Sequence, residues 1–280
     1  MYRRRLCLGL NGEFGGTPEE QIKWIGEAGF DGFFTGWFPE APIGKWRQLA
    51  GEYHLLYQSI HAPFGRAAAL WKEDGDAASA AVEELMNCLR SCSEHEVPIM
   101  VTHAVIGFNE HSPNSRGVGN FEKVVREAER LGVTVAFENT EGEEYLAMLM
   151  PLAESYRSVG FCWDSGHEMC YNRSRDMLAS YGKHLVGTHL NDNLGIRDFD
   201  GRITWHDDLH LLPFDGVADW GKIASRLRLC GYDGPLTFEL NRFSKPGRHE
   251  NDCYGKLSTA EYLAEAYKRA CRVAFLAAGL

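Results

Sequence analysis

The sequence lacks the features that direct a chain to a membrane or to nucleic acid. No segment approaches the roughly 20 apolar residues of a membrane span. The basic start Met1–Arg5 is followed only by the short apolar stretch Leu6–Leu10, which is too short for a signal peptide. Basic residues are also in deficit, because 29 Lys and Arg stand against 39 Asp and Glu, a formal net charge of -10. We therefore expect neither a nucleic acid nor a membrane as the main partner.

The cysteines do not form a CxxC pair, the arrangement typical of many zinc and redox sites. Several of them fall inside runs that resemble strands or helices. Buried free thiols in a reducing compartment are the simplest interpretation, and a cytoplasmic location is expected. The eight positions are Cys7, Cys88, Cys92, Cys162, Cys170, Cys230, Cys253 and Cys271.

What the sequence does contain is a regular alternation of short apolar runs and helical patterns, without a low-complexity linker. Strands are predicted at 6–10, 33–35, 55–60, 98–102, 134–138, 159–163, 185–188 and 236–239. Helices are predicted at 17–28, 43–52, 76–94, 121–131, 143–156, 174–181, 217–230 and 260–278. Alternating βα units with nearly continuous apolar strands indicate a parallel sheet covered by helices. Eight such units predict a single (β/α)8 TIM barrel domain over residues 1–280.

Two of the predicted strands end in Phe-Glu, at Glu138 and Glu239. A strand buried on both faces has no use for a charge except at its open end, so two carboxylates are expected at one site. Four more polar residues lie at or just past strand ends: His61, His103, Asp164 and His189. Each alone has a structural explanation, as a hydrogen-bonded histidine or a helix cap. Together they converge at the catalytic end of a barrel, where a divalent cation would compensate their charge.

The most coherent ligand set is Glu138, Asp164, His189 and Glu239. Three carboxylates and one imidazole suit Mn, Mg or Co and tolerate Zn. Such an ion is a Lewis acid that polarises a carbonyl. Glu138 and Glu239, arriving from different strands, would then serve as acid and base on the two faces of an enediolate.

Short motifs in matching order give the sequence a family resemblance. They are Ser59–Pro63, Thr102–His103, Phe137–Asn139, Trp163–His167, Thr188–Asp192 and Thr237–Glu239. The chain resembles the xylose isomerase-like TIM barrel superfamily, which holds sugar isomerases, ketose 3-epimerases, inosose dehydratases and endonuclease IV. The resemblance implies metal binding by Glu138, Asp164, His189 and Glu239, with proton transfer by the two glutamates. It further implies that the substrate is a small sugar or sugar derivative of carbohydrate metabolism, contacted by His61, His103, Glu144, His167 and Arg197.

The same resemblance leaves other functions open. An endonuclease IV-like phosphodiesterase with three zinc ions would draw additional ligands from His61, His103, His167, Asp208 and His210. Asp208-Leu209-His210 lacks the arginine of the nuclease motif, and the acidic chain offers no clear basic run for phosphates. An inosose dehydratase-like lyase, which shares the enolate, is a third possibility. Association into a homo-oligomer is also left open.

Overall fold

The computed structural model describes residues 4–72, 75–108, 111–196 and 203–279. Its centre is a barrel of parallel strands in the order β7-β6-β5-β4-β3-β2-β1-β8. The strands are β1 (Leu6–Gly9), β2 (Gly32–Gly36), β3 (Leu56–His61), β4 (Ile99–His103), β5 (Thr134–Glu138), β6 (Val159–Asp164), β7 (Leu185–His189) and β8 (Leu236–Phe238). An isolated parallel bridge between Leu190 and Phe238 brings β7 to β8. The predicted (β/α)8 TIM barrel is therefore confirmed.

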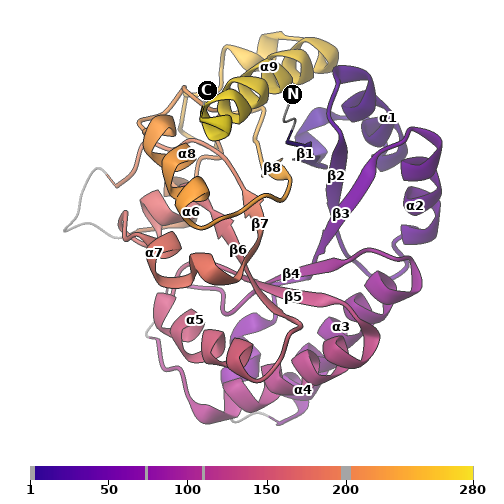
Figure 1. Ribbon diagram of the computed structural model, residues 1–280, viewed down its shortest axis with the longest axis vertical. Coiled ribbons are helices and arrows are strands. Elements are labelled where there is room, and N and C mark those ends of the chain that lie inside the picture. Colours follow the sequence, from indigo (N-terminus) through magenta and orange to yellow (C-terminus); the bar gives the residue numbers. More distant parts are fainter. Residues whose placement is uncertain (1–3, 73–74, 109–110, 197–202, 280) are drawn as a thin grey trace.

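Helices surround this barrel in chain order, and the two ends of the chain lie near each other (Figure 1). They are α1 (Pro18–Ala28), α2 (Ile43–Glu52), α3 (Gly75–Glu94), α4 (Ser115–Leu131), α5 (Glu143–Leu149), α6 (Ser165–Cys170), α7 (Met177–Tyr181), α8 (Trp220–Leu229) and α9 (Thr259–Ala278). None of the helices in the described ranges combines the length and the apolar character that a membrane span requires.

Local chemistry explains where the helices agree with the prediction and where they differ. The predicted start of α1 is confirmed, because Thr17 and Glu20 form a reciprocal capping box before Pro18. The helix α4 begins six residues earlier than predicted, since Asn114 caps it and compensates the weak helix propensity of Gly117 and Gly119.

The structure differs from the predicted helices in two further places. The predicted helix 143–156 ends as an α-helix at Leu149, and a 3₁₀ turn from Met150 to Glu154 follows it. Pro151 lies in that turn and has no N–H to donate. The short helix α6, which carries His167, was not predicted at all.

The buried side chains form one large cluster and one small cluster. Val101, Ala136 and Cys162 form a small buried cluster within the barrel. Trp163 is fully buried in the larger cluster. The cysteines of the described ranges are all free thiols, as expected, but only five are buried, since Cys253 is exposed and Cys230 and Cys271 are partly exposed.

Asp192 anchors the long loop between β7 and α8. Its fully buried carboxylate accepts hydrogen bonds from four donors: the backbone N–H groups of Asn193, Phe214 and Ala218 and the indole Nε1 of Trp220. Gly216 passes so close that a Cβ there would lie 2.1 Å from Asp192 Oδ1. Because the loop carries Asp208 and His210, Asp192 fixes where these two residues enter the barrel mouth.

Replacing Asp192 by Asn should destabilise the protein. An amide supplies one good acceptor where a charged carboxylate serves four donors, so we expect the free energy of unfolding to fall by about 2–4 kcal/mol. Equilibrium urea unfolding measures this change. Asp233→Asn, at an exposed position, is the matched control and should stay within about 0.5 kcal/mol of the wild type. Equal stability of the two variants would contradict the anchoring role.

Candidate metal centre

The six polar residues predicted at strand ends gather at one end of the barrel. The strands β3 to β7 end at His61, His103, Glu138, Asp164 and His189, and Glu239 directly follows β8. A cavity of about 340 Å³ opens there. The polar side chains that line it are His61, His103, Glu138, His167, Asp208, His210 and Glu239.

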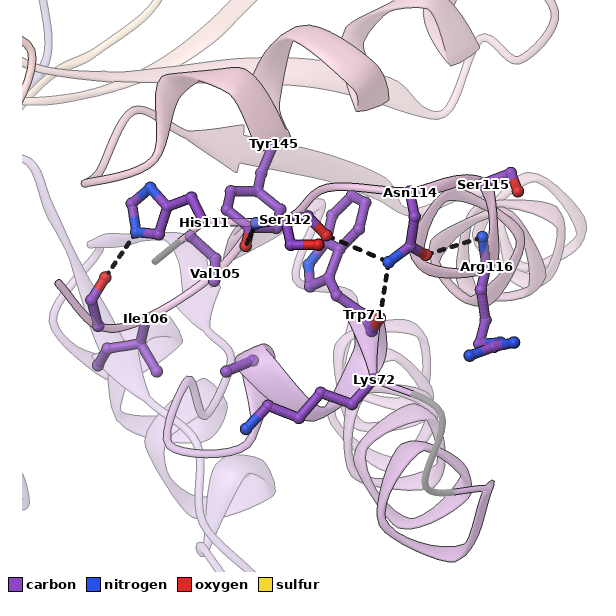
Figure 2. Close-up of a pocket in the computed structure, with 12 residues that line it drawn as sticks. Trp71, Lys72, Val105, Ile106, His111, Ser112, Asn114, Ser115, Arg116 and Tyr145 are labelled. Carbon is purple, nitrogen blue, oxygen red and sulfur yellow. Dashed lines mark hydrogen bonds between the residues drawn. The ribbon is translucent and has the colours of Figure 1, made fainter. Parts of the chain in front are cut away.

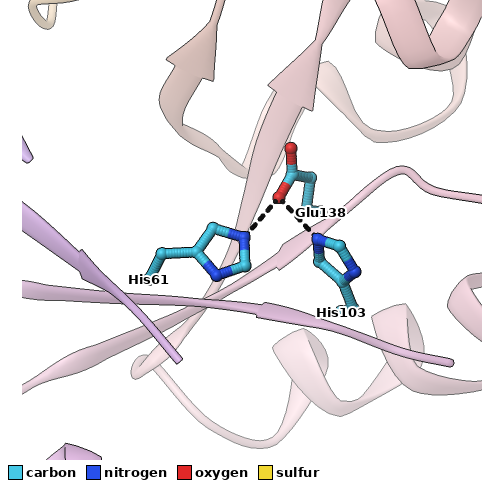
Figure 3. Close-up of side chains that lie close together, drawn as sticks. All are labelled: His61, His103 and Glu138. Atoms are coloured by element: carbon cyan, nitrogen blue, oxygen red, sulfur yellow. Dashed lines mark hydrogen bonds and ion pairs between the residues drawn. The ribbon is translucent and has the colours of Figure 1, made fainter. Parts of the chain in front are cut away.

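Glu138 lies at the centre of this arrangement and is 1% exposed. Its Oε1 is 2.9 Å from His189 Nδ1, and its Oε2 is 3.1 Å from His61 Nε2 and 3.3 Å from His103 Nε2. Figure 3 shows both of the last two imidazoles directed at the same carboxylate oxygen. Burial opposes the charged form, but the surrounding imidazoles lower the pKa of Glu138 well below its ordinary value. The site is therefore built around an ionised carboxylate.

The predicted ligand set comes together as one group. Glu138, Asp164, His189 and Glu239, here called the central group, each offer one ligand atom, and these atoms lie within 4.8 Å of one another. His189 Nδ1 also lies 3.1 Å from Glu239 Oε2, so two carboxylates face this one nitrogen. Glu239 is the outermost member, since its side chain is 30% exposed.

Asp164 is held in place by neighbouring amides. Asn191 Nδ2 donates to Asp164 Oδ2 at 2.9 Å, and the backbone N–H of His167 donates to Oδ1 at 2.6 Å. Asn139 bonds the backbone of Asp164 in both directions. Gly166 makes room for the Asn191 amide, because a Cβ on Gly166 would lie 1.9 Å from Asn191 Oδ1. Burial raises the pKa of Asp164 to about 6.

Two further ligand groups flank the central one. The first, the His61 group, consists of His61, His103 and Glu138, and the second, the His210 group, consists of Asp164, His167 and His210. In each group the candidate ligand atoms also lie within 4.8 Å of one another. The additional ligands proposed for a multi-metal site are thus brought close to the central group.

Asp208 joins the His210 group through one oxygen. Its Oδ2 is 3.4 Å from His167 Nε2 and 2.9 Å from His210 Nε2. Burial disfavours the imidazolium of His210, but the carboxylates of Asp208 and Glu239 raise its pKa to about 9. The backbone φ of His210 is 49°, a conformation that costs free energy for a residue with a side chain and is common at functional sites.

Aromatic rings stack on two of the imidazoles. Phe34 lies parallel to His189 at 4.6 Å, and Phe64 lies parallel to His103 at the same centroid distance. Phe64 is 42% exposed and, with Trp37, lines the cavity at its mouth. The rings fix the orientation of two candidate ligands and present an apolar wall to a bound molecule.

One predicted substrate contact, Glu144, does not line this cavity. Glu144 pairs with His111 at 2.5 Å and lines a separate cavity of about 580 Å³. His111 also lines a third cavity, of about 530 Å³, where Figure 2 shows Asn114 donating to the backbone oxygen of Trp71. Arg197 lies outside the described residues.

Lys245 is a charged residue of the site that the sequence reasoning missed. Its Nζ is 3.9 Å from Asp208 Oδ2, and only 14% of its side chain is exposed. It comes from the loop after β8, where no strand end or motif marked it.

The donor set fits a divalent cation. Four carboxylates, those of Glu138, Asp164, Asp208 and Glu239, meet at one mouth, and Lys245 is the one lysine or arginine of the described ranges that forms an ion pair with any of them. Asp208 Oδ1 is buried without a hydrogen-bond partner. Buried carboxylates of this density require further positive charge, and oxygen-rich ligand sets prefer hard cations.

A family model identifies the class of barrel to which this fold and site belong. A model described as xylose isomerase-like TIM barrel matches residues 22–265. The chain belongs to that family, so the resemblance found in the short motifs is confirmed.

Individual relatives are more distant. The uncharacterized protein y4fM of Sinorhizobium fredii is 34% identical over 126 residues, which cover 43% of this chain and 37% of that protein. A xylose isomerase-like TIM barrel/4-hydroxyphenylpyruvate dioxygenase fusion protein has a TM-score of 0.73 at 15% identity and matches 95% of this chain and 42% of its own.

Two solved structures match over nearly their whole length. A D-psicose 3-epimerase with D-tagatose, from Clostridium cellulolyticum H10, has a TM-score of 0.69 at 14% identity over 96% of this chain and 99% of that one. The IolI protein with a bound zinc atom has a TM-score of 0.72 at 17% identity over 96% and 98%. At this identity the likeness concerns the fold.

Metal affinity should fall more steeply with acidity once the pH is below about 6. The pKa of Asp164 is raised to about 6, so this ligand takes up a proton there, whereas an ordinary aspartate stays ionised. Each further pH unit should cost roughly an additional ten-fold in apparent affinity. Chelator competition between pH 5 and 8 measures the profile. Glu144→Gln, outside the metal cavity, should keep the break near pH 6, and a profile without that break would contradict the role of Asp164.

Proposed function

We propose that the protein is a divalent-metal-dependent isomerase or epimerase that moves a proton on the carbon next to a carbonyl of a sugar or sugar derivative. The observation that carries the proposal is the central group. It unites two glutamates from β5 and the end of β8 with an aspartate and an imidazole, all with ligand atoms within 4.8 Å. Such a group can both hold a hard cation and exchange protons.

The residues divide the work as follows. Glu138, Asp164, His189 and Glu239 would hold the cation, which when bound lowers the energy of a negative charge on the carbonyl oxygen. One of the two glutamates takes the proton from the carbon next to the carbonyl, and the electron pair of that C–H bond moves to the carbonyl to give the enediolate. In epimerisation the other glutamate, after taking up a proton from solvent, donates that proton to the opposite face of the same carbon, and the first glutamate releases its proton to solvent. In isomerisation the proton is instead delivered to the neighbouring carbon of the enediolate.

The walls of the cavity support a sugar-sized substrate. Trp37 and Phe64 offer apolar surfaces, while His61, His103 and His167 offer hydrogen-bonding nitrogens. Structural neighbours agree with this class: besides the D-psicose 3-epimerase, a 3-keto-D-glucoside 4-epimerase, YcjR of E. coli, has a TM-score of 0.64 at 16% identity over 94% of this chain and its whole own length. We favour Mn, Mg or Co as the ion, with Zn tolerated, as in the zinc-containing IolI structure.

Replacing either glutamate by glutamine should abolish turnover. Glu138→Gln removes the carboxylate that four imidazoles face, so we expect loss of both bound metal and activity. Glu239→Gln, at the exposed edge, should retain more metal but lose at least about 10²-fold in turnover if the carboxylate transfers a proton. Metal analysis and ketose epimerisation assays measure the two effects.

Glu94→Gln, an exposed change at the end of α3, is the control and should leave both quantities unchanged. Unchanged turnover in both Glu138→Gln and Glu239→Gln would refute the proton-transfer roles.

A second candidate function is a multi-zinc phosphodiesterase of the endonuclease IV type. The specific observation in its favour is that the His61 group and the His210 group each bring three candidate ligand atoms together beside the central group. The acidic charge of the chain and the Leu209 between Asp208 and His210, where the nuclease motif has arginine, speak against it.

Metal counting and one activity assay separate the two candidates. For the isomerase or epimerase we expect fewer than about three tightly bound zinc ions per chain and no cleavage of a duplex with an abasic site, because the chain is acidic and Lys245 is the one lysine or arginine of the described ranges that pairs with a carboxylate of the mouth. Elemental analysis of zinc-equilibrated protein and a gel assay on abasic duplex provide the data. Three tight zinc ions together with specific strand cleavage would replace the first proposal by the second.

A further inference from the structure

We infer that Lys245 is a built-in cation of the mouth, placed so that its ammonium group weakens the binding of a divalent ion at Asp208 and the His210 group. The inference rests on the metal centre of the proposed function. In this role Lys245 limits how many divalent ions bind at the mouth. The number of bound ions in turn limits which reaction the site can catalyse.

The position of Lys245 is fixed by three contacts. Its Nζ donates to the backbone oxygen of Trp205 at 2.5 Å and lies 5.3 Å from the centroid of the Trp205 ring. The same Nζ is 3.9 Å from Asp208 Oδ2, and both side chains are largely buried, at 14% and 13% exposure. The ammonium group is therefore directed inward at a carboxylate of the site, rather than outward into solvent.

The oxygen that faces Lys245 is the same one that would complete a divalent site. Asp208 Oδ2 lies between His167 Nε2 and His210 Nε2, at 3.4 and 2.9 Å. An ion held by these three atoms would have the ammonium group as a near neighbour. Like charges at such a separation disfavour each other strongly where water is largely excluded.

An ion at the central group would not face the same repulsion from a neighbouring ammonium group. No lysine or arginine within the described ranges forms an ion pair with Glu138, Asp164 or Glu239, whose partners there are imidazoles. A cation entering the mouth is therefore directed to the central group, while Asp208 is already compensated. This arrangement favours the chemistry of a sugar enzyme over that of a cluster that needs all three groups filled.

The test compares zinc binding by wild type, Lys245→Met and Lys245→Arg. Each protein is equilibrated at the same buffered free zinc concentration, and the zinc bound per chain is measured by elemental analysis and chelator competition. We expect Lys245→Met, which keeps the length of the side chain but loses its charge, to bind about one more zinc ion, or to bind its weakest ion at least about ten-fold more tightly. Lys245→Arg should match the wild type.

A double variant, Lys245→Met with His210→Ala, locates the additional ion. It should return to the wild-type count if the ion sits at the His210 group. Equal counts and affinities in wild type and Lys245→Met would overturn the inference, as would an additional ion that persists in the double variant. If Lys245 only pinned the loop through Trp205, Lys245→Met would lower the melting temperature without changing the zinc count, which also overturns it.

This outcome is independent of the proposed reaction. Failure of the epimerase proposal appears as normal turnover in Glu138→Gln and Glu239→Gln, whereas failure of the Lys245 inference appears in zinc binding alone, as unchanged counts and affinities or as an additional ion that persists in the double variant.

Discussion

The concentration of negative charge at the carboxyl ends of the strands is the constraint on which the site depends. Glu138 is buried and ionised, and it is approached by three imidazoles from three different strands. Asp164, Asp208 and Glu239 bring further carboxylates into the same mouth. Such a cluster destabilises the folded barrel, because buried like charges repel and lose their hydration. A bound cation relieves that cost, which is why the arrangement makes most sense as a metal centre.

Residues outside the ligand set hold this charge in position. Asn139 and Asn191 fix Asp164, and the absence of a side chain at Gly166 allows the Asn191 amide to approach. Asp192 gathers four donors and thereby holds both ends of the loop that carries Asp208 and His210. These contacts leave the ligands little freedom to move apart, so the geometry of the mouth is built into the fold and does not await a ligand.

Much of this was predictable from the sequence, for physical reasons. Parallel strands all end at one edge, so Glu138, Asp164, His189 and Glu239 had to converge once their strands were recognised. Periodicity carries no such information about loops. Lys245 reaches Asp208 from a loop that has no repeating pattern, and Glu144, in the first turn of α5, pairs with His111 of a loop and does not line the metal cavity. The helix α6 escaped prediction because its six residues are too few to show a helical period.

The central claim is that the central group binds a divalent ion, and locating the ion tests it most directly. Crystals of manganese-loaded protein, with anomalous diffraction data collected on both sides of the manganese absorption edge, would give the position and identity of each ion. An anomalous peak enclosed by Glu138, Asp164, His189 and Glu239 is expected. Fully loaded protein with no peak there, or with peaks only elsewhere, would contradict it.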